Sequence, residues 1–236
     1  KPGNSMFLWP SNQTVQDSML QDHQLMETIY CEGVYPMHLQ GISTDQKNSI
    51  YWSFTNEMVR TDLKGKVLNR AQVLNHHGDL CYVDGKIYVA VNLGKFNQPA
   101  GQEDSWVFVY NARDLKEIAR HKVPELVHGA GGIAFNKGKF YVVGGLPTGY
   151  NENYVYEYDK DFKFIKRHII ASGYTRLGIQ TVELYAGQWW FGCYGSPKLL
   201  RTDDQFQILD KNDFDASLGI VAYSPRKLMI GTSKTN

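Results

Sequence analysis

The sequence predicts an all-β protein, a five-bladed β-propeller with four-stranded blades, and three observations lead to this fold class. No long segment places apolar residues at helical spacing. Short β-rich runs separated by turn residues recur along the 236 residues. The last repeat lacks its second half, which the N-terminus can supply. We therefore expect residues 1–236 to form a single domain.

The first recurring unit is a hairpin made of an apolar run, a turn with glycine and an aromatic-rich run. Asp-Gly and related pairs suit the positive φ angles of a tight hairpin turn. Each copy therefore predicts the two inner strands of one blade. The copies are residues 80–89, 133–142 and 182–191, with variants at 42–54 and 220–230.

A second hairpin follows most copies of the first, and an Asp or Asn residue opens its turn. These hairpins, which predict the two outer strands, are residues 59–67, 107–118, 155–164 and 199–208. The first strands of successive units start 38, 53, 49 and 38 residues apart, at Ile42, Leu80, Ile133, Val182 and Ile220. Four strands at such spacing are typical of a propeller blade.

The two chain ends complement each other. After Ile230 only two strands of the last blade have been made. Residues 6–9 and 25–30 predict its third and fourth strands. The last blade is then completed by two strands from the C-terminal end and two from the N-terminal end. This closure removes exposed sheet edges. Residues 10–24 then form a long connection with a glycosylation sequon at Asn12. A β-sandwich with coincidental hairpins is the alternative fold.

Composition restricts the partners. Apolar residues make up 42% of the chain, its net charge is +1, and it contains no run of Lys and Arg. Nucleic acid and anionic membrane surfaces need clustered positive charge, so neither is expected as a partner. No apolar stretch approaches the roughly 18 residues that a spanning helix needs. The first residues, Lys1 to Ser5, contain no signal region, so we take the chain as mature or trimmed.

The three cysteines, Cys31, Cys81 and Cys193, are odd in number and widely spaced. This disfavours both a disulfide framework and a cysteine-based zinc site. One disulfide with a spare thiol stays open, and the cysteines do not decide the compartment.

Propeller architecture directs attention to the connections that lead into the inner strands, because these share one face around the central channel. Four of the seven histidines fall there, and the corresponding connection of the next blade carries a cation and an amide. A long polar loop, residues 93–105, starts beside them. We expect ligand-binding residues at His38, His76, His77, His128, Arg176, Gln180 and Asn92.

Three interpretations of this cluster stay open. His38, His77 and His128 are candidate ligands of a divalent transition metal, which would support a lyase or hydrolase. Without a metal, the same histidines and Arg176 would bind a small polar ligand that is carbohydrate-like or acidic. Alternatively, the histidines only cap backbone groups and bind nothing. A protein-interaction scaffold is a separate alternative for the function of the whole domain.

Other catalytic motifs are scarce. The sequence contains no phosphate-binding glycine loop, no GxSxG and no HExxH. Asp79 and Glu183 are the only candidates for a glycosidase-type carboxylate pair near the axis, and their relative position rests on the assumed register.

Three short motifs at the start of inner strands, Gln40-Gly41-Ile42, Gly78-Asp79-Leu80 and Gly131-Gly132-Ile133, resemble those of NHL/YVTN-like and glutaminyl-cyclase-like propellers. Residues 38–54 and 76–80 are also similar to uncharacterised bacterial extracytoplasmic propellers. The resemblance implies the fold and a secreted or periplasmic location, and it implies no substrate. We expect a monomer that binds a small molecule or glycan.

Overall fold

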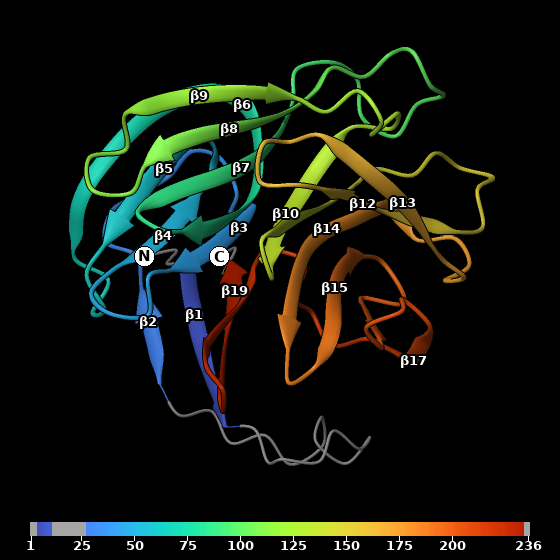
Figure 1. The fold of residues 1–236 in the computed structure, drawn as a ribbon. Coiled ribbons are helices and arrows are strands. Elements are labelled where there is room, and N and C mark those ends of the chain that lie inside the picture. Colours follow the sequence, from blue (N-terminus) through green and yellow to red (C-terminus); the bar gives the residue numbers. More distant parts are fainter. Residues whose placement is uncertain (1–3, 11–26, 234–236) are drawn as a thin grey trace.

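The computed structural model of this chain describes residues 4–10 and 27–233, which form strands and turns and no helix. All strand pairs are antiparallel, and they build three four-stranded sheets and one seven-stranded sheet. Figure 1 shows these sheets fanned around a common centre. The prediction of an all-β chain with four-stranded sheets is confirmed. Within the described ranges there is also no helix that could span a membrane.

The seven-stranded sheet contains, in spatial order, β3 (Gly41–Thr44), β4 (Ile50–Ser53), β5 (Thr55–Thr61), β6 (Val67–Val83), β7 (Lys86–Asn92), β8 (Ser105–Asn111) and β9 (Glu117–Lys122). The next sheet contains β10 (Ala130–Asn136), β11 (Lys139–Gly144), β12 (Asn153–Tyr158) and β13 (Phe164–Ile170). The third contains β14 (Arg176–Tyr185), β15 (Gln188–Tyr194), β16 (Leu199–Thr202) and β17 (Ile208–Asn212). The fourth combines both chain ends, in the order β18 (Ile220–Ser224), β19 (Lys227–Ser233), β1 (Asn4–Pro10) and β2 (Thr28–Tyr30).

The long strand β6 differs from the sequence expectation. Two strands were expected, joined by a connection that contains His76 and His77, but the chain stays extended throughout. The first part of β6 pairs with β5 and the last part with β7, and His77 is the register partner of both Thr55 and Val91. A positive φ of 68° at His76 and register shifts on both sides turn the strand from one set of partners to the other.

The chain ends meet as neighbours in one sheet. β1 pairs with β19 from Asn4↔Ser233 to Pro10↔Lys227, and its other edge pairs with β2. The expected strand at residues 6–9 thus lies within β1. Of the expected strand at 25–30, the structure shows β2 from Thr28, while Leu25 and Met26 lie outside the described residues, as does the sequon at Asn12.

Five segments face the common centre, and we call them the inner strands: β3, the last part of β6 (residues 77–83), β10, β14 and β18. Their contacts form a cycle, because β3 contacts β6, β6 contacts β10, β10 contacts β14, β14 contacts β18 and β18 contacts β3. Glycine allows the close approach that this cycle needs. A Cβ atom added to Gly78 would lie 2.3 Å from the carbonyl oxygen of Gly131.

Apolar side chains fill the space between neighbouring sheets. Val143 and Val155 pack with Trp189 and Phe191 from the next sheet, all of them buried. The sheet of the chain ends packs against β3 and β4 in the same way, through Ile29, Met229, Ile42 and Trp52. All three cysteines are unpaired, so no disulfide supports the fold.

Candidate functional site

A cavity of about 290 Å³ opens where the chain enters the inner strands, and we call it the mouth cavity. Its wall comes from the segment before β3, the middle of β6, the loop after β7, and β14 with β15. Among its lining residues are His38, His76, Phe96, Gln180 and Tyr194. The face that the sequence analysis singled out therefore does contain a cavity.

Three of the seven candidate residues have exposed or half-buried side chains in this wall. His38 is exposed, and its Nε2 lies 2.6 Å from Nε2 of Gln40. His76 is also exposed, and its ring centre lies 5.8 Å from that of Phe96. Gln180 is half-buried and donates a hydrogen bond of 2.7 Å to the carbonyl oxygen of Leu177. The structure thus brings these three side chains to one cavity.

His77 contributes no exposed side chain to the mouth. It is 0% exposed, and its Nε2 lies 2.7 Å from the hydroxyl oxygen of Tyr110. The rings of His77 and Phe108 pack in a T-shaped arrangement, with their centres 5.2 Å apart. Burial lowers the pKa of His77 to about 4, so the imidazole is neutral at pH 7. Its side chain belongs to the core.

His128 and Asn92 both hold the loop that follows β7. Nδ1 of His128 lies 2.9 Å from the carbonyl oxygen of Gln98, and its buried ring packs edge-on against Tyr150. Oδ1 of the buried Asn92 accepts hydrogen bonds from the amides of Gly94 and Asp104, which closes the base of the loop. Both residues therefore hold in place the loop that contributes Phe96 and Asn97 to the wall of the mouth cavity.

This placement separates the three histidines of the metal hypothesis. His38 is exposed in the mouth, His77 is in the core, and His128 lies against the loop, beside a different cavity of only about 10 Å³. Across the described part of the chain, no group of three or more His, Cys, Asp or Glu side chains is arranged to hold a metal ion. The donor set that a transition metal needs is not assembled there.

Arg176 is a chain neighbour of the lining residue Leu177 but does not itself line the mouth cavity. It lies at the start of β14, opposite Tyr194 in the register, and its side chain is exposed beside Gly195. Its guanidinium makes no ion pair with another described residue. It is therefore an exposed cation next to the cavity and not part of its wall.

The wall of the mouth cavity contains strained backbone that the sequence did not reveal. Four of its non-glycine residues have positive φ: Thr55 at 70°, His76 at 68°, Leu177 at 61° and Asn97 at 58°. Asn and His tolerate this region, but a β-branched Thr there is an outlier. Such strain costs about 1–3 kcal/mol per residue and gathers at functional sites.

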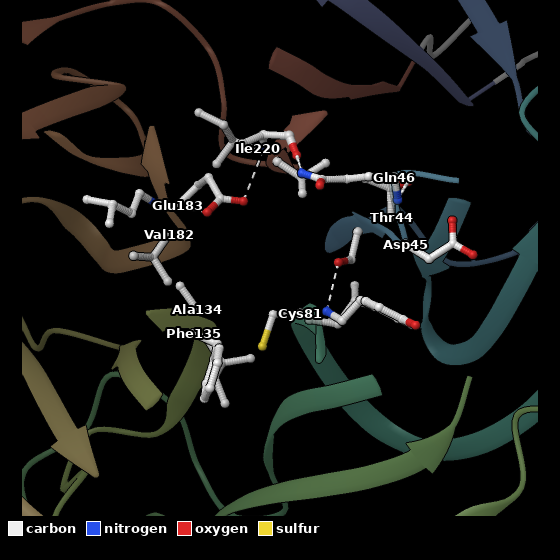
Figure 2. Close-up of a pocket in the computed structure, with 16 residues that line it drawn as sticks. Thr44, Asp45, Gln46, Cys81, Ala134, Phe135, Val182, Glu183 and Ile220 are labelled. Carbon is white, nitrogen blue, oxygen red and sulfur yellow. Dashed lines mark hydrogen bonds between the residues drawn. The ribbon is translucent and has the colours of Figure 1, made fainter. Parts of the chain in front are cut away.

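A second cavity, of about 340 Å³, lies among all five inner strands further along the same axis, and we call it the axial cavity (Figure 2). The register separates the two cavities. Gly78 and Gln180 line the mouth, whereas Leu80 and Val182, two residues on, line the axial cavity. The carboxyl group of Asp79, 1% exposed, lies at the level between them.

The two carboxyl groups considered as an acid–base pair differ in access. Oδ2 of Asp79 accepts a hydrogen bond of 3.2 Å from the amide of Val182, and burial raises its pKa well above the usual value. Glu183 lines the axial cavity, and burial raises its pKa to about 7. Because Asp79 is sealed from both cavities, the pair does not flank a space that a glycosidic bond could enter.

No protein-family model matches the sequence, and no curated protein is detectably similar to it. Among solved structures, a protein of unknown function from Bacteroides caccae is similar over 94% of this chain and 98% of its own, with 10% identity and a TM-score of 0.48. A chain of a mitotic checkpoint complex is similar over 87% of this chain and 66% of its own, with 8% identity and a TM-score of 0.49. The computationally designed protein Ika4 is similar over 76% of this chain and 99% of its own, with 12% identity and a TM-score of 0.44. At these scores the similarities carry no argument about blade number or function.

Proposed function

We propose that this chain is a five-bladed β-propeller that binds a small polar ligand, carbohydrate-like or acidic, in the mouth cavity. The blade number follows if β6 is counted twice, as the last strand of one blade and the first strand of the next. Each part then has its own partner strand, β5 or β7. The cycle of contacts among the five inner strands supports the ring, and the pairing of β1 with β19 supports its closure.

The observation that carries the binding proposal is the strained backbone in the cavity wall. Thr55 is held at its positive φ by the surrounding structure, and its Oγ1 donates a hydrogen bond of 3.3 Å to the carbonyl oxygen of His38. Asn97 is fixed twice, since its amide donates to the carbonyl oxygen of His128 and its Oδ1 accepts from the amide of Leu146. A rim fixed at such cost is preorganised, which lowers the entropy lost when a ligand binds.

The chemistry of the wall defines the ligand class. None of the described lining residues is Asp, Glu, Lys or Arg, and two exposed cations, Lys95 and Arg176, are chain neighbours of the lining residues Phe96 and Leu177. The amide of Gln180 and the exposed imidazoles of His38 and His76 offer hydrogen bonds. Phe96 and Tyr194 add aromatic surface of the kind on which a sugar ring can lie. The cavity therefore suits a neutral or anionic polyhydroxylated molecule.

The test is binding of a defined probe set at pH 7 and low salt: glucose, galactose, glucuronate, galacturonate and citrate. We expect at least one probe to raise the Tm, with a Kd measurable by calorimetry. His76→Ala and Gln180→Ala should each weaken binding about tenfold, which corresponds to about 1.4 kcal/mol. Lys160→Ala, in an exposed turn away from the mouth, is the control and should leave the Kd unchanged. Failure of all five probes, or an unchanged Kd in both mouth variants, would reject the proposal.

The secreted or periplasmic location and the monomeric state stay predictions. No specific observation favours a metal-assisted lyase or hydrolase, because His77 and His128 are engaged away from the mouth. Likewise, no specific observation favours a protein-interaction scaffold.

A further inference from the structure

We propose that the axial cavity is a second binding site, which takes a small organic cation such as a primary amine, with the Glu183 carboxylate as its counter-ion. This proposal does not depend on ligand binding in the mouth cavity, since Asp79 separates the two spaces. The axial cavity, about 340 Å³, is within the usual size of small-molecule sites.

The axial cavity differs from the mouth cavity because acidic residues are part of its lining. Its lining residues include two carboxylates, Asp45 and Glu183, and no Lys, Arg or His. Asp45 is occupied in its own turn, where Oδ1 accepts hydrogen bonds of 2.9 Å from the amides of residues 47, 48 and 49. Figure 2 shows the Asp45 carboxylate turned away from the cavity and that of Glu183 turned into it.

The Glu183 carboxylate is fixed in place but retains capacity for a ligand. Oε1 accepts a hydrogen bond of 2.9 Å from the amide of Leu184, and Oε2 accepts one of 3.1 Å from the amide of Ala222. An ionised carboxylate offers about four acceptor positions, so roughly two remain for an incoming N–H group. A charge-assisted bond from an ammonium group is stronger than a neutral hydrogen bond.

The rest of the wall suits the carbon skeleton of an amine. Phe135, Val182 and Leu184 give apolar surface, and Figure 2 shows the sulfur of Cys81 facing the same space. Burial raises the pKa of the Cys81 thiol well above its usual value, so this group adds no charge. Ser43, Thr44 and Gln46 add polar groups to the same wall. A mixed wall with one inward carboxylate suits a ligand that has one cationic end and a short carbon skeleton.

A metal ion fits this wall less well. Ca²⁺ takes six to eight oxygen ligands, often from several carboxylates, and Mg²⁺ keeps an octahedral shell. The axial cavity directs one carboxylate inward, and the described residues form no cluster of three or more metal-ligating side chains. An organic cation needs only the single counter-ion that Glu183 supplies.

Protonation of Glu183 gives the proposed site a pH dependence. The ionisable groups near it are Asp79 and Cys81 on β6, and Tyr82 lines the same cavity, whereas the Asp45 carboxylate before β4 is turned away. None of these is a cation, and burial raises the pKa of Glu183 to about 7. A bound amine needs the ionised form, so its affinity should rise between pH 6 and pH 8.

The test uses 2-phenylethylamine and putrescine, with 3-phenylpropionate and 2-phenylethanol as matched anionic and neutral probes. We expect the amines alone to bind saturably at millimolar concentration and to raise the Tm, more at pH 8 than at pH 6. Glu183→Gln should weaken amine binding at least tenfold. Asp161→Asn, which removes one exposed carboxylate elsewhere, should not. His76→Ala, in the mouth, should also leave amine binding unchanged.

A second variant covers the case that Glu183→Gln folds poorly. Ala222→Leu fills part of the axial cavity without altering the carboxylate, and it should also abolish amine binding. The proposal is overturned if neither amine binds, if the anionic probe binds equally well, or if amine binding survives both substitutions. It is overturned too if Ca²⁺ or Mn²⁺, and no amine, raises the Tm in a manner that requires Glu183.

Discussion

The buried carboxyl group of Asp79 on β6 accepts a hydrogen bond from the amide of Val182 on β14, 103 residues later in the chain. This bond links two inner strands that are not neighbours in any sheet, at the level between the mouth and axial cavities. Gly41 closes the same level from β3, since a Cβ atom there would lie 2.4 Å from Oδ1 of Asp79. Close packing around Asp79 therefore divides the space along the axis into the mouth cavity and the axial cavity.

Gly41→Ala should therefore destabilise the protein strongly. The added Cβ would also lie 2.5 Å from the Cα atom of Asp79, so the backbone itself must move. Overpacking typically costs about 1–3 kcal/mol and occasionally more, and we expect the upper end here because backbone atoms must move. The measurement is the free energy of unfolding in urea at pH 7.

Gly85→Ala is the matched control for that prediction. Gly85 has a φ of 79°, but a Cβ atom there meets nothing within 4 Å. Its substitution should cost about 1–2 kcal/mol, from backbone conformation alone. Equal losses in the two variants would show that close packing around Asp79 is not responsible.

The contact between His77 and Tyr110 gives a prediction about stability in acid. Burial lowers the pKa of folded His77 to about 4, from 6.5 in the unfolded chain. Between these values the unfolded state binds the proton, so stability is full above pH 6.5 and falls as the pH falls toward 4. The loss is up to about 3 kcal/mol, at about 1.4 kcal/mol per pKa unit. His77→Leu should remove this part of the pH dependence.

A double-mutant cycle tests the same contact at pH 7. Tyr110→Phe leaves the buried Nε2 of His77 without its partner and should cost about 1–3 kcal/mol. In the His77→Leu background the same change should cost much less, because the group that it leaves unsatisfied is gone. Additive losses would mean that the two side chains are not coupled.

Local turn chemistry explains why the hairpins could be predicted from sequence. In the turns at 84–85, 137–138 and 186–187 both residues have positive φ, as the Gly-containing pairs suggested. The continuous β6 could not be predicted, because it depends on His77 pairing with two strands at once. Residues 75–79 carry turn-like and glycine signals that tertiary pairing overrides.

The candidate site was predictable in location but not in detail. His76 and His77 are adjacent, yet one is exposed in the mouth and the other is buried. Side chains alternate across a strand, and a positive φ or a register shift changes which one faces the core, so sequence could not assign the two histidines. The axial position of Glu183 likewise depended on a register that only the structure supplies.

Removal of residues 1–30 should leave an insoluble or molten protein. The deletion takes away β1 and β2, so β19 loses the partner with which it pairs from Lys227 to Ser233. A two-stranded remnant is marginal in water, and its bare edge favours aggregation. Soluble yield and the cooperativity of melting are the readouts. Adding residues 1–30 as a separate peptide should restore both, whereas a soluble, cooperatively melting truncation would contradict the role of β1.

Glu183 should give a pH dependence of opposite sign to that of His77. Burial raises its folded pKa to about 7, from 4.5 in the unfolded chain, so the folded state binds the proton more tightly between these values. The stabilisation is full below pH 4.5 and is lost as the pH rises through 7. Glu183→Gln is neutral at every pH, so relative to the unmodified chain its free energy of unfolding should rise by about 1–3 kcal/mol between pH 4.5 and pH 8.

Urea unfolding at these two pH values measures the change, with Asp161→Asn as the control that should show none. The Glu183 charge is one of the causes that raise the pKa of Asp79, so the difference also contains a smaller contribution from Asp79. A difference that stays constant with pH would show that the Glu183 carboxylate is not held in a desolvated cavity.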